Sequence, residues 1–133
     1  MAEGLKAIAC VGLGGALGST LRYLLGAMIQ RALAGGLYAK LPLATFAVNI
    51  IGCLGIGLLA AWTEGRTDLS PAQRLFIFTG LLGGFTTFST YAHEGQQLLR
   101  EGLFPQAAIY ILGQVILGLA AVWLGYALMR WAH

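Results

Sequence analysis

The sequence predicts an all-α integral membrane protein with four transmembrane helices and almost no soluble part. Of the 133 residues, 58% are hydrophobic and only 10% are charged, whereas soluble domains average about 25% charged residues. Four stretches reach the roughly 20 predominantly apolar residues that a helix needs to cross a bilayer. The 20 glycines favour helices that pack closely in a membrane, because small residues let two backbones approach each other.

Four spans joined by short segments fill the chain as one transmembrane domain over residues 1–133. The predicted spans are residues 5–29, 42–62, 75–98 and 105–131. We expect Pro42 and Pro105 in the first turn of their helices, where a missing N–H is tolerated. Tyr38, Trp62 and Trp131 lie near predicted span ends, where aromatic residues commonly meet the membrane interface.

The distribution of Lys and Arg predicts no single orientation in the membrane. With four spans, one side holds the N-terminus, the second connection and the C-terminus, with Lys6, Arg66, Arg74 and Arg130. The other side holds Arg31, Lys40 and Arg100. Orientation follows the bias of Lys and Arg between the two sides, and here that bias is almost absent. We therefore expect insertion both ways and pairing as an antiparallel homodimer; a single orientation set by another feature is the alternative.

Composition argues against several other classes of protein. The formal net charge of +3 is small and scattered, so we expect no nucleic-acid partner. Cys10 and Cys53 lie in apolar runs without metal-ligand spacing or a disulfide framework, as small hydrophobic residues do. No acid–base pair, nucleophile or metal–histidine pattern is recognisable, so we do not expect an enzyme. The first apolar run lacks a small-residue cleavage site and contains Arg22, so we expect a retained helix.

Each of three spans carries one narrow polar stripe on an apolar body. Residues at spacings of three or four share a helical face, and the three stripes are Gly14, Gly18, Arg22 and Gly26; Thr45, Asn49 and Gly52; and Tyr110, Gln114 and Gly118. Small residues in the first stripe predict a packing face, and Arg22 either reaches the interface or attracts anions towards a vestibule. Polar residues inside a membrane are candidate functional residues. They line a path for a small solute or bind the helices to one another.

The third span contains the most informative segment. Two adjacent glycines, Gly83 and Gly84, precede Thr86 and Thr87, and this run is a poor stretch of helix. A break here frees backbone carbonyls, which are tolerated at membrane depth where they are buried or face a cavity. Freed carbonyls coordinate cations in the broken helices of transporters.

Two aromatic residues follow the predicted break. Phe88 and Tyr91 lie three residues apart and share a helical face, which is common in core packing. Their ring edges are positive, so a small anion can also rest against them. The neighbouring hydroxyls of Ser89 and Thr90 favour an anion path.

At these residues the chain resembles the Fluc/CrcB family of fluoride channels. The most specific motif is the run Gly83-Gly84-x-Thr86-Thr87-Phe88-Ser89-Thr90. Two further motifs are Gly14-Gly15-x-x-Gly18-x-x-x-Arg22-Tyr23 in the first span and Thr45-x-x-x-Asn49-x-x-Gly52 in the second. The resemblance extends over essentially the whole chain, including its length and its four spans.

The resemblance implies a passive, multi-pass channel in the inner or plasma membrane of a microbe exposed to fluoride. Fluoride, selected over chloride, would leave the cytoplasm through two antiparallel pores in a dual-topology homodimer. A sodium ion at the dimer interface would be held by the main-chain carbonyls of Gly83 and Thr86. Phe88 and Tyr91 would line each pore, with Asn49 as a hydrogen-bond donor. The remaining residues implied near the path are Thr45, Thr90, Tyr110, Arg22 and Glu94.

Two residues depart from the family pattern. Tyr91 stands where Phe is common, and its hydroxyl either donates to the ion or turns away to another buried partner. Gln114 stands where a small hydroxyl residue is more usual, which leaves the outer polar track undefined.

Two other classes of membrane protein remain as alternatives. A small dual-topology, proton-coupled multidrug transporter also has four spans, but it needs a membrane-embedded carboxylate, typically in the first helix. Here Glu3 precedes that helix and Glu94 lies late in the third. A structural subunit without transport explains the glycines but not the Gly83–Thr90 motif.

Overall fold

Helices make up nearly all of the computed structural model, which describes residues 2–34 and 41–132. The elements are α1 (Ala2–Leu33), α2 (Leu43–Thr63), α3 (Pro71–Arg74), the π-helix η1 (Leu75–Leu82), α4 (Gly83–Phe85), α5 (Phe88–Arg100) and α6 (Phe104–Trp131). Four spans are long and apolar enough to cross a membrane: Ala2–Leu33, Leu43–Thr63, Pro71–Arg100 and Phe104–Trp131. The third is interrupted at Thr86 and Thr87. The predicted all-α class, the four spans and the mid-membrane break are confirmed.

The span boundaries differ from the predicted ones by a few residues. The first helix begins at Ala2 and continues to Leu33. Pro42 is the N-cap of α2 and lies before its first turn, whereas Pro105 lies in the first turn of α6 as expected. Tyr38 and Lys40 lie outside the described residues.

The third span begins earlier than predicted because Ser70 caps it. The Ser70 hydroxyl accepts a hydrogen bond from the Gln73 N–H, and the Gln73 side chain accepts one from the Ser70 N–H. This reciprocal pair is a capping box, and Pro71 occupies the following position, where its fixed backbone angle suits a helix start. The Ser70-Pro71-x-Gln73 pattern was available in the sequence, and the predicted start at residue 75 missed it.

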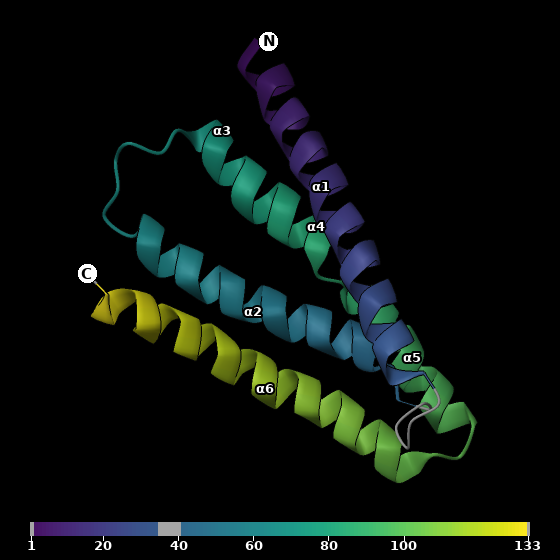
Figure 1. Cartoon of the computed structure of the whole chain (residues 1–133). Helices are drawn as coiled ribbons and strands as arrows, with labels where there is room; N and C mark the ends of the chain where they lie inside the picture. Colours follow the sequence, from purple (N-terminus) through teal and green to yellow (C-terminus); the bar gives the residue numbers. More distant parts are fainter. Residues whose placement is uncertain (1, 35–40, 133) are drawn as a thin grey trace.

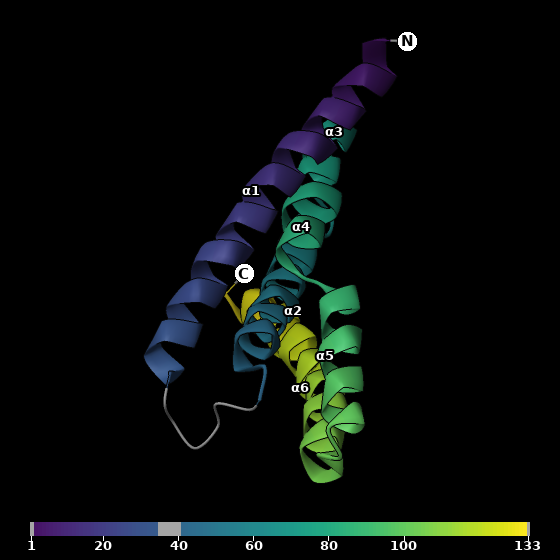
Figure 2. The ribbon, with the colours of Figure 1, turned by 90° about the vertical axis from the view of Figure 1, so that its right-hand side faces the viewer.

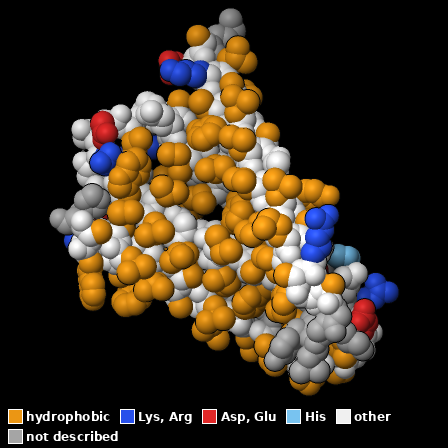
Figure 3. Space-filling model, in the orientation of Figure 1, with side chains coloured by type: hydrophobic (Ala, Val, Ile, Leu, Met, Phe, Trp, Pro, Cys, Tyr) orange, Lys and Arg blue, Asp and Glu red, His pale blue; other side chains and the backbone are white. Residues whose placement is uncertain are grey.

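The spans pack as two pairs. Helix α1 lies along η1 and α4, and α2 lies along α6 (Figure 1). After the break, α5 packs mainly against α6 (Figure 2). The N-terminus, the α2–α3 connection and the C-terminus lie towards one end of the molecule, and the turn between α5 and α6 lies at the other (Figure 1). Hydrophobic side chains cover most of the visible surface, and the few charged side chains in view lie near its ends and on its right-hand flank (Figure 3).

Glycine allows the α1 pair to approach backbone to backbone. Gly14 and Gly18 are buried, and a Cβ at Gly18 would overlap the Leu81 carbonyl of η1. The predicted packing face is therefore confirmed at these two residues. It is wrong at Gly26, where a Cβ would meet no heavy atom within 4 Å, because that part of α1 borders a groove.

Candidate ion pathway

The backbone at the break leaves the helical conformation for two residues. Thr86 (φ −87°, ψ 160°) and Thr87 (φ −150°, ψ 114°) are extended. The Thr86 N–H still donates to the Leu82 carbonyl at 3.0 Å. The Thr87 N–H would reach the Gly83 carbonyl in a continuous helix, but it donates instead to Oδ1 of Asn49 at 2.8 Å. The Gly83 carbonyl thus loses its helical donor, so the predicted break does free a backbone carbonyl.

Asn49 of α2 stabilises this break with both ends of its amide. Its Oδ1 accepts from the Thr87 N–H, and its Nδ2 donates to the Thr87 carbonyl at 3.1 Å. The residue is only 7% exposed. Backbone polar groups inside a membrane need partners, and Asn49 supplies two of them. One hydrogen of its NH₂ group remains beyond this pair, so Asn49 can also act as a donor to an ion.

Thr87 begins the second half of the third span as the N-cap of α5. Its hydroxyl accepts from the Thr90 N–H at 3.3 Å and lies 2.9 Å from the Thr90 hydroxyl. Ser, Thr, Asn and Asp are preferred N-caps because the side-chain oxygen satisfies a free N–H of the first turn. Threonine is therefore well suited to restart the helix directly after the break.

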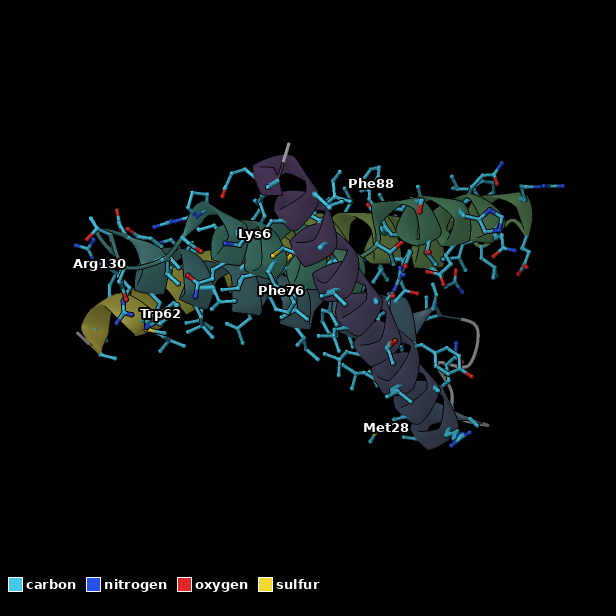
Figure 4. All side chains as sticks on the ribbon, turned by 90° about the horizontal axis from the view of Figure 1, so that it is seen from above. Lys6, Met28, Trp62, Phe76, Phe88 and Arg130 are labelled. Atoms are coloured by element: carbon cyan, nitrogen blue, oxygen red, sulfur yellow. The ribbon has the colours of Figure 1, made fainter. Side chains whose placement is uncertain are left out.

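The two aromatic residues of α5 continue into a row of rings. The centroids of Phe88 and Tyr91 are 5.5 Å apart, those of Tyr91 and Tyr110 are 5.6 Å apart, and Phe46 lies 6.1 Å from Tyr110. Tyr91 is 7% exposed, whereas Phe88 is 79% exposed and projects from the start of α5 (Figure 4). The Tyr91 hydroxyl donates to the Ile111 carbonyl of α6 at 3.0 Å. The sequence left open whether this hydroxyl faces the ion or turns away to another buried partner; in the structure it donates to a protein carbonyl.

Glu94 joins three helices one turn beyond Tyr91. Its Oε1 accepts from the Thr45 hydroxyl at 2.9 Å, and its Oε2 accepts from the Tyr110 hydroxyl at 2.7 Å. Arg22 of α1 and Thr90 line the same groove, whose volume is about 460 Å³. Four residues predicted near the path therefore come together here from α1, α2 and α5, and Tyr110 reaches the same carboxylate from α6.

A second groove, of about 440 Å³, lies on the other side of the break. Asn49, Gly83, Thr86, Phe88 and Tyr91 contribute to its lining. Thr87 lines both grooves, so the Asn49–Thr87 pair stands between them.

Two predicted polar residues are less well accounted for within the single chain. Gln114 lines the second groove, and its Oε1 is buried without a hydrogen-bond partner among the described residues. Ser89 lies on the exposed face of α5 and lines neither groove. Sequence reasoning also missed three partners, Thr87 for Asn49, Ile111 for Tyr91 and Phe46 for Tyr110, since nothing in the spacing of polar residues points to them.

The sequence that forms these grooves matches a known protein family. The model of the CrcB-like protein (camphor resistance) family matches residues 9–126. The chain belongs to this CrcB-like family. The matched range includes both grooves and the broken third span of this CrcB-like chain.

Named relatives have nearly the same length as this CrcB-like chain. The chain is 48% identical over 120 residues to a fluoride-specific ion channel of Methylobacillus flagellatus, covering 90% of this chain and 91% of the relative. It is 44% identical over 121 residues to one of Nitratidesulfovibrio vulgaris, covering 91% and 94%. A third, of Chloroflexus aurantiacus, is 44% identical over 124 residues, covering 93% and 95%. The resemblance found from the motifs is confirmed, and the chain is a multi-pass membrane protein.

Proposed function

We propose that this CrcB-like chain is a passive channel that lets fluoride leave the cytoplasm across the inner membrane. The relatives that match almost its full length are fluoride-specific ion channels by name. The observation that carries the proposal is the pair of grooves that meet at the Asn49–Thr87 contact. We interpret the two grooves as the two halves of one ion path.

The donors along this path suit a small, tightly hydrated anion. A pore must replace the ion's water with aimed donors, yet hold the ion weakly enough to release it. The side chains of Asn49, Thr90 and Tyr110 provide neutral N–H and O–H groups. Arg22 of α1 lines the first groove and not the second, so it can attract an anion on one side of the break without holding it at the centre.

The rival multidrug transporter lacks its main requirement here. Such a protein needs a carboxylate that exchanges protons and substrate within the membrane, typically on the first helix. In this structure the acidic residue of α1 is Glu3, in its first turn, and Glu94 is engaged by two hydroxyl groups. Membership of the CrcB-like family also disfavours that function.

The proposed channel is an antiparallel homodimer. Phe88 is 79% exposed beside a largely apolar groove, although the proposed path runs past its ring. A second copy placed against this face would cover Phe88 and complete the walls of the path. The nearly equal numbers of Lys and Arg on the two sides allow the second copy to insert in the opposite orientation.

A sodium ion at the centre of this dimer fits the residues at the break. Thr87 donates to Asn49 and leaves the Gly83 carbonyl without its helical donor, and Gly83 and Thr86 line the same groove. Two carbonyl oxygens from each copy would surround one ion. Neutral oxygen ligands suit a hard cation better than a transition metal, and no cluster of three His, Cys, Asp or Glu residues is present among residues 2–34 and 41–132. The ion would join the two copies at their broken helices.

Fluoride efflux from liposomes tests the proposed function. Vesicles that contain the purified protein, loaded with potassium fluoride and given an ionophore that lets potassium leave to balance the charge, should release fluoride without a proton gradient, whereas vesicles loaded with potassium chloride should retain chloride. The matched variant Phe88→Ile removes a ring edge and keeps an apolar side chain, so efflux should fall strongly while gel filtration is unchanged. Wild-type vesicles that retain fluoride would overturn the channel. Full efflux through Phe88→Ile would remove Phe88 from the pathway.

A further inference from the structure

A π-helix of eight residues, η1 (Leu75–Leu82), lies directly before the break in the third span. The N–H of Gly83 bonds to the Phe78 carbonyl five residues earlier as well as to the Gly80 carbonyl. π-Helices are rare and occur mostly as single turns within α-helices, frequently at functional sites. The residues of η1 that line the second groove are Phe78 and Leu82, which are apolar and cannot donate hydrogen bonds to an ion from their side chains.

The contacts between η1 and α1 show what the π turn does to the helix. A Cβ on Gly14 would overlap the main chain at Phe76, and a Cβ on Gly18 would overlap the main chain at Leu81 and Phe85. The same Cβ on Gly14 would also come within 2.9 Å of the Leu81 N. Phe76 and Leu81 are five positions apart, the spacing of one π turn, whereas Leu81 and Phe85 are four apart, close to one α turn. The π turn thus accommodates one additional residue between the contacts that Phe76 and Leu81 make with α1.

The residues on either side of the π turn face two different neighbours. Gly80 and Gly84 lie against the α1 backbone at Gly14 and Gly15. Gly83 and Thr86 line instead the groove that is bounded by α2, α6 and the third span, whose described lining contains no residue of α1. One short segment thus places Gly80 and Gly84 against α1 and Gly83 and Thr86 at the groove.

We infer that the π turn of η1 is a positioning element that sets the rotation of the Gly83 and Thr86 carbonyls towards the ion path. This inference rests on the proposed function, because the sodium ion and the fluoride path give the rotation its purpose. If residues 75–82 were α-helical, the carbonyls of Gly83 and Thr86 would be rotated relative to α1. The third span could then keep either its packing on α1 or the ion site, but not both.

Deletion of one residue from η1 tests this role, because a π turn in an α-helix holds one residue more than an α turn. Thr79 is exposed and lines neither groove, so ΔThr79 removes no side chain of the path. Thr79→Ala is the matched control, since it removes the same side chain and keeps the chain length. In ΔThr79, fluoride efflux should fall by at least about tenfold, which corresponds to roughly 1.4 kcal/mol of barrier. Thr79→Ala should conduct as the wild type does.

A second readout separates positioning from general damage. Replacing sodium by a bulky organic cation should lower the melting temperature of the wild type and of Thr79→Ala, but not that of ΔThr79, whose carbonyls no longer converge. Wild-type protein that passes no fluoride would defeat the proposed function itself. Wild-type conduction together with equal efflux and an equal sodium effect in ΔThr79 would overturn only the positioning role. If ΔThr79 does not fold, an experimental structure of the wild type decides, and an α-helical segment at residues 75–82 would overturn the inference.

Discussion

Asn49 holds the break in the third span through hydrogen bonds that its position in the sequence does not reveal. The spacing of Thr45, Asn49 and Gly52 correctly predicted a shared face, and all three contact the third span: Thr45 through Glu94, Asn49 through Thr87 and Gly52 through the methyl group of Thr86. The identity of these partners was beyond sequence reasoning. Thr87 is 38 residues from Asn49 and Glu94 is 49 residues from Thr45, and such pairs depend on how the helices pack.

Replacing Asn49 by Leu should destabilise the break and abolish most of the fluoride flux. The substitution leaves the N–H and the carbonyl of Thr87 without partners, and an unsatisfied buried polar group costs roughly 1–3 kcal/mol. Thermal unfolding in detergent and efflux from liposomes measure the two effects. Thr20→Ala is the control, because the Thr20 hydroxyl bonds only to the Ala16 carbonyl of its own helix. Wild-type stability and flux in Asn49→Leu would show that the break does not need this amide.

Replacing Tyr91 by Phe should have a mild effect. The hydroxyl donates to the Ile111 carbonyl, so its loss removes one hydrogen bond, worth about 0.5–1.5 kcal/mol, and leaves the ring beside Phe88. Selectivity over chloride should be unchanged, and flux should change by less than about tenfold, or roughly 1.4 kcal/mol of barrier. Paired measurements of fluoride and chloride efflux check both points. A larger loss of fluoride flux would show that the hydroxyl belongs to the pore.

At the scale of elements, the third span shows what a local pattern can and cannot predict. The run of two glycines and two threonines predicted a break, but Gly83 and Gly84 remain helical and the extended residues are Thr86 and Thr87. Low helix propensity marks a weak region without fixing the residue at which it breaks. Here Gly84 is needed for contact with Gly15 of α1, and Thr87 caps α5. The π turn of η1 was not predicted, because no spacing of residues in the sequence pointed to it.

The close contact between α1 and the third span at Gly18 leads to a second prediction at the scale of the elements. Gly18→Ala should destabilise the protein and lower its flux, because the added Cβ overlaps the Leu81 carbonyl and pushes α1 away from the third span. Gly12→Ala is a matched control in the same helix, since a Cβ at Gly12 meets no heavy atom within 4 Å. Alanine is the better helix former by about 0.8–1.0 kcal/mol, so the control should be neutral or slightly stabilised. Unfolding measured by gel filtration after heating compares the two, and equal behaviour would contradict the close approach.

At the scale of the whole molecule, most of the charge outside the first groove lies near the ends of the helices and is partly neutralised there. Trp62 and Arg130 lie at the same end of the α2–α6 pair (Figure 4). Arg130 forms an ion pair with Glu64 at 3.3 Å, and the Tyr126 hydroxyl also donates to Glu64. The Tyr126 hydroxyl, with the Arg130 guanidinium, lowers the pKa of the Glu64 carboxyl below its ordinary value. Glu64 therefore stays ionised and paired at neutral pH.

The balance of charge between the two ends leads to the prediction that tests the antiparallel dimer. The orientation in which a membrane protein inserts depends on the numbers of Lys and Arg on the two sides, and Asp and Glu contribute little. By sequence, one side holds Lys6, Arg66, Arg74 and Arg130 and the other holds Arg31, Lys40 and Arg100, and an excess of four against three is too small to select one orientation. A tag at the C-terminus of the wild type should therefore be accessible from both sides of the membrane. Two lysines added within residues 30–41 should drive that connection to the cytoplasmic side and leave tags on one side only.

Such a biased variant should lose function alone, because every copy then faces the same way and no antiparallel partner remains. Function should return when it is co-expressed with a variant biased oppositely by two lysines added within residues 63–70. Accessibility of the tags to a membrane-impermeant reagent measures orientation, and fluoride efflux measures function. Two lysines added beyond His133 act on the same side as those at residues 63–70 and provide an independent partner for the rescue. A wild-type tag found on one side only, or full efflux from one biased variant expressed alone, would contradict the antiparallel dimer, since neither result leaves room for a copy in the opposite orientation.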